Sequence, residues 1–142
     1  MKHKFLIVFL TLFSIVAQAQ IFTPVKWTFE IENTGNNEYN LRYIAKIDKG
    51  WNVYSQFTSD DGPVPTEIVY EEKAGIEFIG KATESGAKKS GMDPLFGVNV
   101  IKFLADKPFV IEQKIRVKDP CKSISGYVTY MSCDNEKCLS PT

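Results

Sequence analysis

The sequence has 142 residues, equal numbers of acidic and basic side chains, and a single histidine, His3. This balance of charge gives no reason to expect nucleic acid or an anionic membrane surface as a partner. His3 lies in a segment that we expect to be removed, and a chain without histidine cannot run a Ser-His-Asp or Cys-His mechanism or build a His-containing zinc site.

The first 19 residues have the pattern of an export signal. Residues 1–4 are positively charged, residues 5–16 form an apolar run, and Ala17-Gln-Ala19 is a small-residue cleavage site. Cleavage after Ala19 leaves residues 20–142, a single domain with a net charge of −2 because Lys2 and Lys4 are lost. No other run approaches the ~20 apolar residues of a membrane span. We therefore expect a soluble, exported, periplasmic protein.

Alternation of apolar and polar residues predicts short β-strands along the mature chain. The first strand, 25–31, has Val25, Trp27, Phe29 and Ile31 on its buried face. A turn at 33–37 leads to a second strand that alternates from Tyr39 to Ile47, and a third covers 51–57. In the third strand Tyr54 lies opposite the buried face, where it is either a second contact surface or an exposed ring; we expect the exposed ring.

The second half of the sequence continues the same pattern. Residues 58–65 form a proline-containing loop, residues 81–91 are polar and predict an exposed loop, and Gln113 interrupts an apolar strand face. Leu95 and Phe96 either begin the core face of the next strand or form a hydrophobic lid, and periodicity favours the core. The strands predicted in this half are 67–71, 76–80, 98–104, 109–117 and 125–132.

About eight short strands, frequent turn signals and no amphipathic helix predict an all-β fold, an immunoglobulin-like antiparallel β-sandwich. Only four residues follow Cys138. We therefore expect the sandwich to lack its last strand, as in a fragment or in a stand-alone protein with a frayed edge.

Two cysteines, Cys133 and Cys138, flank a four-residue spacer at the expected tip of a hairpin. Opposed residues of a hairpin lie within disulfide range. A ring of six residues contributes only about 2 kcal/mol in the chain-entropy model, so it is a weak staple. An exposed hairpin tip is also accessible to another protein's thiolate. Asp134 and Glu136 disfavour a nearby thiolate and Lys137 favours one, so a structural disulfide and a redox-active pair both remain open.

A third cysteine, Cys121, leaves the count odd, so at least one cysteine is unpaired or pairs with another chain. The three cysteines and Met131 could bind a soft ion such as Cu(I), but their spacing is not diagnostic of a metal site. We expect no metal and no other cofactor.

The sequence YVTYMSC at 127–133, with CLSP at 138–141, GWNVYSQ at 50–56 and GPVP at 62–65, resembles the N-terminal periplasmic domain of the disulfide reductase DsbD. The resemblance runs from about Val25 to Pro141. It implies an immunoglobulin-like fold with a reversible cysteine pair, in which Cys133 forms the mixed disulfide and Cys138 resolves it. It also implies partners: the membrane electron-transporter and thioredoxin-like domains of a DsbD-type system as donors, and exported thioredoxin-fold proteins, including disulfide isomerases and cytochrome c maturation thioredoxins, as acceptors.

The same resemblance assigns a cap loop to residues 93–97. Family members cover the disulfide with a loop that carries an acidic residue and aromatics before a glycine, which favours the lid for Leu95 and Phe96 and makes Asp93 its acidic residue. Tyr54 falls on a family position whose ring faces the active site. The cysteine spacer is one residue shorter than in the family, and Cys121, expected to be buried and inert or a site of off-pathway pairing, has no counterpart.

The sequence thus predicts an exported thiol–disulfide interchange domain that passes reducing equivalents through Cys133 and Cys138. The alternative is a non-enzymatic immunoglobulin-like binding module whose disulfide only closes a hairpin.

Overall fold

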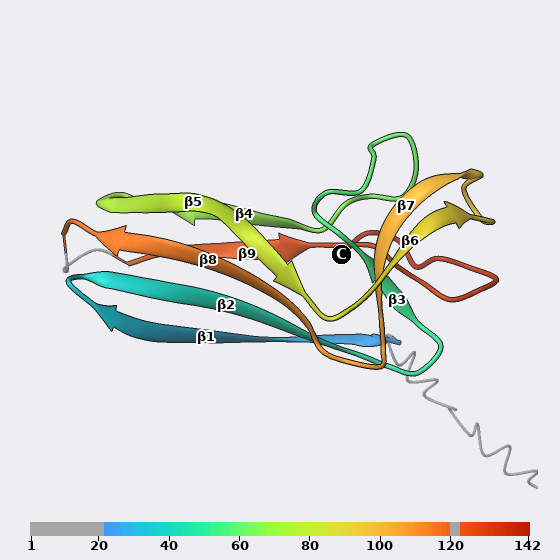
Figure 1. Cartoon of the computed structure of the whole chain (residues 1–142), viewed down its shortest axis with the longest axis horizontal. Helices are drawn as coiled ribbons and strands as arrows, with labels where there is room; N and C mark the ends of the chain where they lie inside the picture. Colours follow the sequence, from blue (N-terminus) through green and yellow to red (C-terminus); the bar gives the residue numbers. More distant parts are fainter. Residues whose placement is uncertain (1–21, 120–122) are drawn as a thin grey trace, which may run out of the picture.

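The structure, a computed structural model, describes residues 22–119 and 123–142 (Figure 1). The expected signal peptide and Cys121 lie outside the described residues. The predicted all-β class is confirmed, with antiparallel sheets packed as a sandwich. The strands are β1 (Val25–Gly35), β2 (Glu38–Ile47), β3 (Asn52–Tyr54), β4 (Glu67–Glu72), β5 (Ile76–Ser85), β6 (Ala87–Asp93), β7 (Val98–Leu104), β8 (Phe109–Val117), β9 (Ser125–Thr129) and β10 (Ser132–Cys133).

Three sheets make up the described part of the chain. The first has the order β1-β2-β8-β5, the second β10-β3-β7-β6, and the third consists of β4 and β9. Figure 1 shows the long strands of the first sheet in one half of the molecule and β3, β6 and β7 at the other end. The cysteine turn follows β10, so it belongs to the end formed by the second sheet.

The main core lies where the sheets meet. Val53 of β3, Phe103 of β7 and Phe109 of β8 are almost fully buried, and the two phenylalanine rings stack with centroids 4.1 Å apart. Burial of each such side chain contributes about 1.5–3 kcal/mol. Trp27 of β1 packs on Phe109 and on Tyr130, which joins the first sheet to the segment that carries the cysteines.

The predicted turn at 33–37 connects β1 to β2. Gly35, Asn36 and Asn37 all adopt positive φ, with values of 91°, 53° and 59°. Glycine and asparagine are the residues that tolerate this conformation. The turn sets the register of a long hairpin in which Val25 lies opposite Ile47 and Ile31 lies opposite Leu41.

The first strand departs from its predicted buried face. Val25 and Trp27 are covered, whereas Phe29 and Ile31 are 62% and 65% exposed. The reason is that these two side chains line an open groove of about 250 Å³ between β1, β2, β4 and β9 instead of a closed core. Alternation therefore identified the strand and its face but not where the covering layer ends.

The third strand is shorter than predicted, and the prediction for Tyr54 was wrong. Trp51 and Val53 are buried as expected, but Phe57 is 55% exposed and lies beyond the end of β3. Tyr54 is fully buried, because both faces of β3 are covered. In a strand buried on both sides, alternation does not separate a solvent face from a core face.

The predicted exposed loop at 81–91 was also wrong. β5 extends to Ser85, and β6 runs from Ala87 to Asp93 and pairs with β7 along its whole length. Both β5 and β6 are edge strands, and most of residues 81–91 are exposed. Edge strands commonly carry lysine and other charged residues, so their composition resembles that of a loop.

The predicted strand 125–132 is divided between two sheets. β9 pairs with β4, whereas β10 pairs with β3. Beyond the cysteine turn the chain runs back beside this segment: the amide of Leu139 donates to Ser132 O at 2.9 Å, and Tyr130 and Thr142 exchange two backbone hydrogen bonds. This return segment forms these backbone bonds and an isolated bridge at Cys138, and within the described residues no strand follows β10.

Gln113, which interrupts an apolar face in the sequence, is buried on β8. Its Nε2 donates to Lys114 O at 2.8 Å and lies 3.4 Å from the carbonyl oxygens of Ile79 and Gly80. The register of β5 against β8 is irregular at this point, between Ile79 and Thr83. The irregularity leaves carbonyls available to the glutamine, which satisfies its buried amide.

Candidate active site

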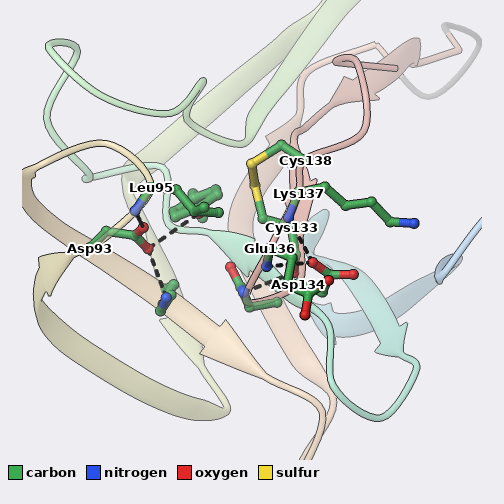
Figure 2. Close-up of a disulfide and its surroundings, with 10 residues drawn as sticks. Asp93, Leu95, Cys133, Asp134, Glu136, Lys137 and Cys138 are labelled. Atoms are coloured by element: carbon green, nitrogen blue, oxygen red, sulfur yellow. Dashed lines mark hydrogen bonds and ion pairs between the residues drawn. A yellow bond between two sulfur atoms is a disulfide. The ribbon is translucent and has the colours of Figure 1, made fainter.

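Cys133 and Cys138 form a disulfide, with Cα atoms 4.0 Å apart. Cys133 ends β10, and the two cysteines form an isolated antiparallel bridge (Figure 2). Cys133 is completely buried, whereas Cys138 is partly exposed. The two cysteines therefore differ in exposure, a difference that their spacing in the sequence does not reveal.

The spacer between the cysteines is an ordered turn. An Oδ1 atom of Asp134 accepts hydrogen bonds from the amides of Glu136 and Lys137, both at 2.8 Å, and the amide of Asp134 donates to Lys137 O at 2.9 Å (Figure 2). The two bonds from the amides hold the pKa of Asp134 below its ordinary value. Asp134 therefore has two roles: its side chain stabilises the turn, and its charge lies near the disulfide, as the sequence indicated.

Asn52 fixes the position of Cys133 from the neighbouring strand. The two residues lie opposite one another in the β3–β10 pair, and Asn52 Nδ2 donates to Cys133 O at 2.8 Å. Asn52 is buried, and its Oδ1 has no hydrogen-bond partner among the described residues. A buried amide whose oxygen has no partner costs stability. The hydrogen bond to Cys133 O is therefore the favourable contact that the Asn52 side chain makes in this site.

A small apolar cluster surrounds the disulfide. Tyr54 and Val100 are buried with Cys133, and other side chains pack against them, namely those of Phe96, Val98, Met131 and Cys138. The ring of Phe96 meets the ring of Tyr54 edge-on at a centroid distance of 5.9 Å. The disulfide is thus covered on its inner side by aromatic and aliphatic groups.

Asp93 anchors the loop that carries Phe96. Its carboxylate, 1% exposed, lies 2.7 Å from Lys102 Nζ and accepts hydrogen bonds from the amide of Leu95 at 3.0 Å and from the Tyr54 hydroxyl at 3.4 Å (Figure 2). Its backbone carbonyl accepts from the amide of Gly97 at 2.8 Å, where φ is 69°. These four contacts fold residues 93–97 into a tight turn, which we name the cap loop.

The charges in this network reinforce each other. Burial alone raises the pKa of Asp93, but the hydrogen bonds from Lys102, Leu95 and Tyr54 outweigh it and hold that pKa below its ordinary value. Burial and the Asp93 carboxylate raise the pKa of the Tyr54 hydroxyl well above its ordinary value. Asp93 is therefore ionised at neutral pH and Tyr54 is protonated, so the tyrosine donates and the carboxylate accepts.

The structure thus brings together three of the four residues that the sequence proposed for the cap. Tyr54 and Phe96 belong to the apolar cluster with Cys133, and Asp93 is bonded to the Tyr54 hydroxyl, whereas Leu95 is 39% exposed and is not part of the cluster. A hollow of about 150 Å³ lies between the cap loop, β6 and the turn after Cys133, with Asp134 on its border. The cap loop and the cysteine turn are therefore neighbouring elements on one end of the molecule.

Comparisons with known proteins identify a solved structure with the same fold. No protein-family model matches the sequence, and no curated protein matches it. Among solved structures, the crystal structure of the N-terminal periplasmic domain of ScsB from Proteus mirabilis matches with a TM-score of 0.59 and 14% sequence identity. The match covers 85% of this chain and 45% of that one. The chain has the fold of this ScsB domain.

ScsB is a protein of the DsbD family, so the fold agrees with the resemblance found in the sequence. At 14% identity the agreement concerns the fold, and the chain spans less than half of the matched ScsB chain. The roles of individual residues rest on the site itself.

Two residues of the site, Asn52 and Lys102, were missed by reasoning from the sequence. Each is a polar or charged residue between large apolar neighbours, in the runs Trp51-Asn-Val53 and Ile101-Lys-Phe103. A polar residue inside such a run needs a partner when the strand is buried on both faces. This pattern in the sequence could have identified Asn52 and Lys102 as residues with buried partners. The partners themselves, Cys133 O and Asp93, are known only from the structure.

In the structure the sulfurs of Cys133 and Cys138 are bonded to each other. Within residues 22–119 and 123–142, no group of three or more His, Cys, Asp or Glu side chains is placed to hold a metal ion. Over the same residues, no helix is long and apolar enough to cross a membrane.

Proposed function

We propose that this chain is an exported thiol–disulfide interchange domain that passes reducing equivalents through the Cys133–Cys138 pair. The observation that carries the proposal is a disulfide that closes only six residues and belongs to an apolar cluster with Tyr54 and Phe96, next to a turn that the Asp93–Lys102 ion pair anchors. The bond is worth about 2 kcal/mol as a staple. An anchored turn that places Phe96 against this cluster is better explained if it controls the access of other thiols to the disulfide.

The order of the chemical steps follows from exposure. A donor thiolate attacks Cys138 Sγ, the partly exposed sulfur, and forms a mixed disulfide while Cys133 leaves as a thiolate. The second thiolate of the donor then attacks its own sulfur in that bond and releases Cys138. The pair gains two electrons and, on protonation, two protons, and the donor is left as a disulfide.

The reverse sequence delivers the electrons to an oxidised acceptor. The Cys138 thiolate attacks the acceptor disulfide, and Cys133 then attacks Cys138 Sγ to restore the ring and release the acceptor as a dithiol. The sequence resemblance implied the opposite assignment, with Cys133 in the mixed disulfide. The complete burial of Cys133 favours Cys138 for that role.

The cap loop supplies the control of access. Phe96 and Tyr54 cover the inner side of the disulfide, and docking of a partner beside the cap loop displaces Phe96 and exposes the sulfurs. The partners that suit this chemistry are exported thioredoxin-fold proteins. The membrane electron-transporter and thioredoxin-like domains of a DsbD-type system are the proposed donors, and disulfide isomerases and cytochrome c maturation thioredoxins are the proposed acceptors.

The reduction potential is the first test. The purified protein is equilibrated in glutathione buffers of graded composition, and the fraction of reduced Cys133 and Cys138 is measured by thiol labelling. We expect a potential above the value of about −300 mV that marks inert structural disulfides. A potential well below that value would leave a binding module with a structural disulfide as the better account.

Trapping then assigns the two sulfurs. Cys133→Ala and Cys138→Ala variants, both in a Cys121→Ser background, are first activated at the remaining cysteine as the mixed disulfide with thionitrobenzoate. Each is then mixed with an exported thioredoxin-fold protein that lacks its own resolving cysteine, whose thiolate displaces thionitrobenzoate as the leaving group. We expect a mixed disulfide through Cys138 in the Cys133→Ala variant and little in the reciprocal variant. Equal trapping by both would contradict the assignment by exposure, and trapping by neither would contradict the proposed function.

A further inference from the structure

The free edge of the first sheet is unusual for an edge strand. β1 ends the order β1-β2-β8-β5 and runs for 11 residues, and Figure 1 shows it as the outermost strand along one long side of the molecule. Long edges with exposed apolar side chains pair readily with other strands unless they are blunted by charge, glycine or proline. Phe29 and Ile31 are the large exposed apolar side chains on this edge.

Two other edges are protected in ways that β1 is not. β6 carries Lys88 and Lys89 and has Gly91 at a φ of 149°, and β5 has an irregular register near Gly80, where φ is 69°. These are devices that prevent strand addition. β1 also carries charged residues, Lys26 and Glu30, but it has no irregularity of this kind and follows a regular ladder with β2 from Val25 to Asn33.

The hydrogen-bonding groups of β1 that face away from the sheet can be identified. Asp48 N donates to Pro24 O, and this pair continues the β1–β2 register, so even-numbered residues of β1 bond to β2. The alternation of an antiparallel ladder then turns the N–H and C=O groups of Trp27, Phe29 and Ile31 outward. A strand added here would bond to these three residues.

We propose that the partner on this edge is β1 of a second copy of the chain, paired antiparallel about a two-fold axis at Thr28. This register places Lys26 opposite Glu30 of the partner subunit and Trp27 opposite the partner's Phe29, and each contact occurs twice by symmetry. Opposite charges and aromatic pairs are the favourable cross-strand combinations. The strand is therefore complementary to itself in this one register.

The intrachain surroundings of Lys26 support this partner. Its cross-strand neighbour on β2 is Lys46, a like charge, and both side chains are exposed. Glu30 contacts Arg42 at 2.5 Å on the same solvent face. A carboxylate from the partner would relieve the repulsion at Lys26, which supplies the charge complementarity that a hydrophobic edge alone does not provide.

The dimer is independent of the thiol–disulfide proposal and is tested separately. The purified protein with Cys121→Ser, which excludes a covalent dimer through that cysteine, is examined by analytical ultracentrifugation over a dilution series. We expect a monomer–dimer equilibrium. A monomer at every concentration overturns the proposal and leaves the edge to a strand of another protein.

Charge exchange tests the register. Lys26→Glu and Glu30→Lys each place like charges opposite one another twice and should weaken dimerisation roughly tenfold, whereas the double variant should restore it. Lys46→Glu makes the same charge change one strand further in and should leave the dimer intact. A dimer that tolerates Lys26→Glu, or a double variant that fails to recover, overturns this register.

A proline tests the outward edge directly. Phe29→Pro removes an N–H that faces away from β2, so the monomer fold is retained while the added ladder loses a donor. Phe29→Ala keeps the donor and removes only the ring. We expect dimerisation to be lost in the proline variant and weakened in the alanine variant, with thermal unfolding used to confirm that both fold. Equal dimerisation of the two variants contradicts an added strand.

Discussion

The side-chain amide of Asn52 donates a hydrogen bond to the backbone carbonyl of Cys133, with the nitrogen and oxygen 2.8 Å apart in a buried site. Asn52→Ala removes this donor from a carbonyl that has no access to bulk water, and we expect a loss of about 1–2 kcal/mol in the free energy of unfolding. Urea denaturation measures it. Asn99→Ala, an exposed asparagine on β7, is the control and should change stability little. An equal effect of both variants would contradict a special role for Asn52.

Asp93→Asn should loosen the cap loop. The change removes the ion pair and leaves the Lys102 ammonium, with a side chain only 16% exposed, without its carboxylate. Loss of a partly buried charge-assisted bond costs about 1.5–3 kcal/mol. We also expect faster reduction of the disulfide by dithiothreitol, measured by thiol labelling. Unchanged stability and unchanged reduction rate would show that Asp93 does not hold the loop.

The same carboxylate predicts a pH dependence. The pKa of Asp93 is lower in the folded chain than its ordinary value of about 3.9. The unfolded chain therefore binds the proton more readily, so this group contributes stability that is present above that pH and is lost as pH falls through its folded pKa. Asp134 and Glu38 shift in the same direction, so the contribution of Asp93 is the difference between the acid unfolding curves of the wild type and Asp93→Asn. Parallel curves would contradict it.

Phe96→Ala should open the inner side of the disulfide. Phe96 packs against the cluster of Tyr54, Val100 and Cys133, whereas its neighbour Leu95 is 39% exposed and outside that cluster. We expect the Phe96 variant to be reduced several-fold faster by dithiothreitol, with a loss of stability of about 1–2 kcal/mol. Leu95→Ala is the matched control and should leave the reduction rate near the wild-type value. The reverse ranking would assign the lid to Leu95.

Replacing both cysteines measures the worth of the ring. The double variant Cys133→Ala, Cys138→Ala should lose about 2 kcal/mol, the loop-closure value for six residues. Chemical denaturation of the oxidised wild type and of the variant gives the difference. A loss well above this value would mean that the disulfide is a main staple of the fold, which would favour the binding-module alternative.

The sequence predicted the all-β class and most strands, because regular alternation records a sheet with one covered face. The prediction was wrong where a strand does not have one covered and one exposed face. Tyr54 was expected to be exposed, yet β3 is covered on both faces. Residues 81–91 were expected to be a loop, yet they form edge strands whose polar side chains face water. For Tyr54 the missing information was the second layer that covers β3, and for residues 81–91 it was their position at the edges of two sheets.

The candidate site divides in the same way. Spacing pointed to the cysteine pair, which the structure joins as a disulfide, and family resemblance pointed to the loop at 93–97, whose role as a cap stays a prediction. The anchors, Asn52 and Lys102, could not, because each acts through a partner distant in sequence: Cys133 for Asn52 and Asp93 for Lys102. The unequal burial of Cys133 and Cys138 was also beyond the sequence, since it depends on what packs against β10.

The shortest internal strand, β3, connects the disulfide to the residues that cover it. β3 has three residues, and its first and last hold different parts of the site: Asn52 holds the carbonyl of Cys133, and Tyr54 contacts both Asp93 and Phe96. The separation between the sulfur ring and its cover is thus fixed by about two peptide units of extended backbone. Such a spacer is stiff, so Asn52 and Tyr54 keep a fixed separation, and a cover that opens does so at the contact between Phe96 and Tyr54.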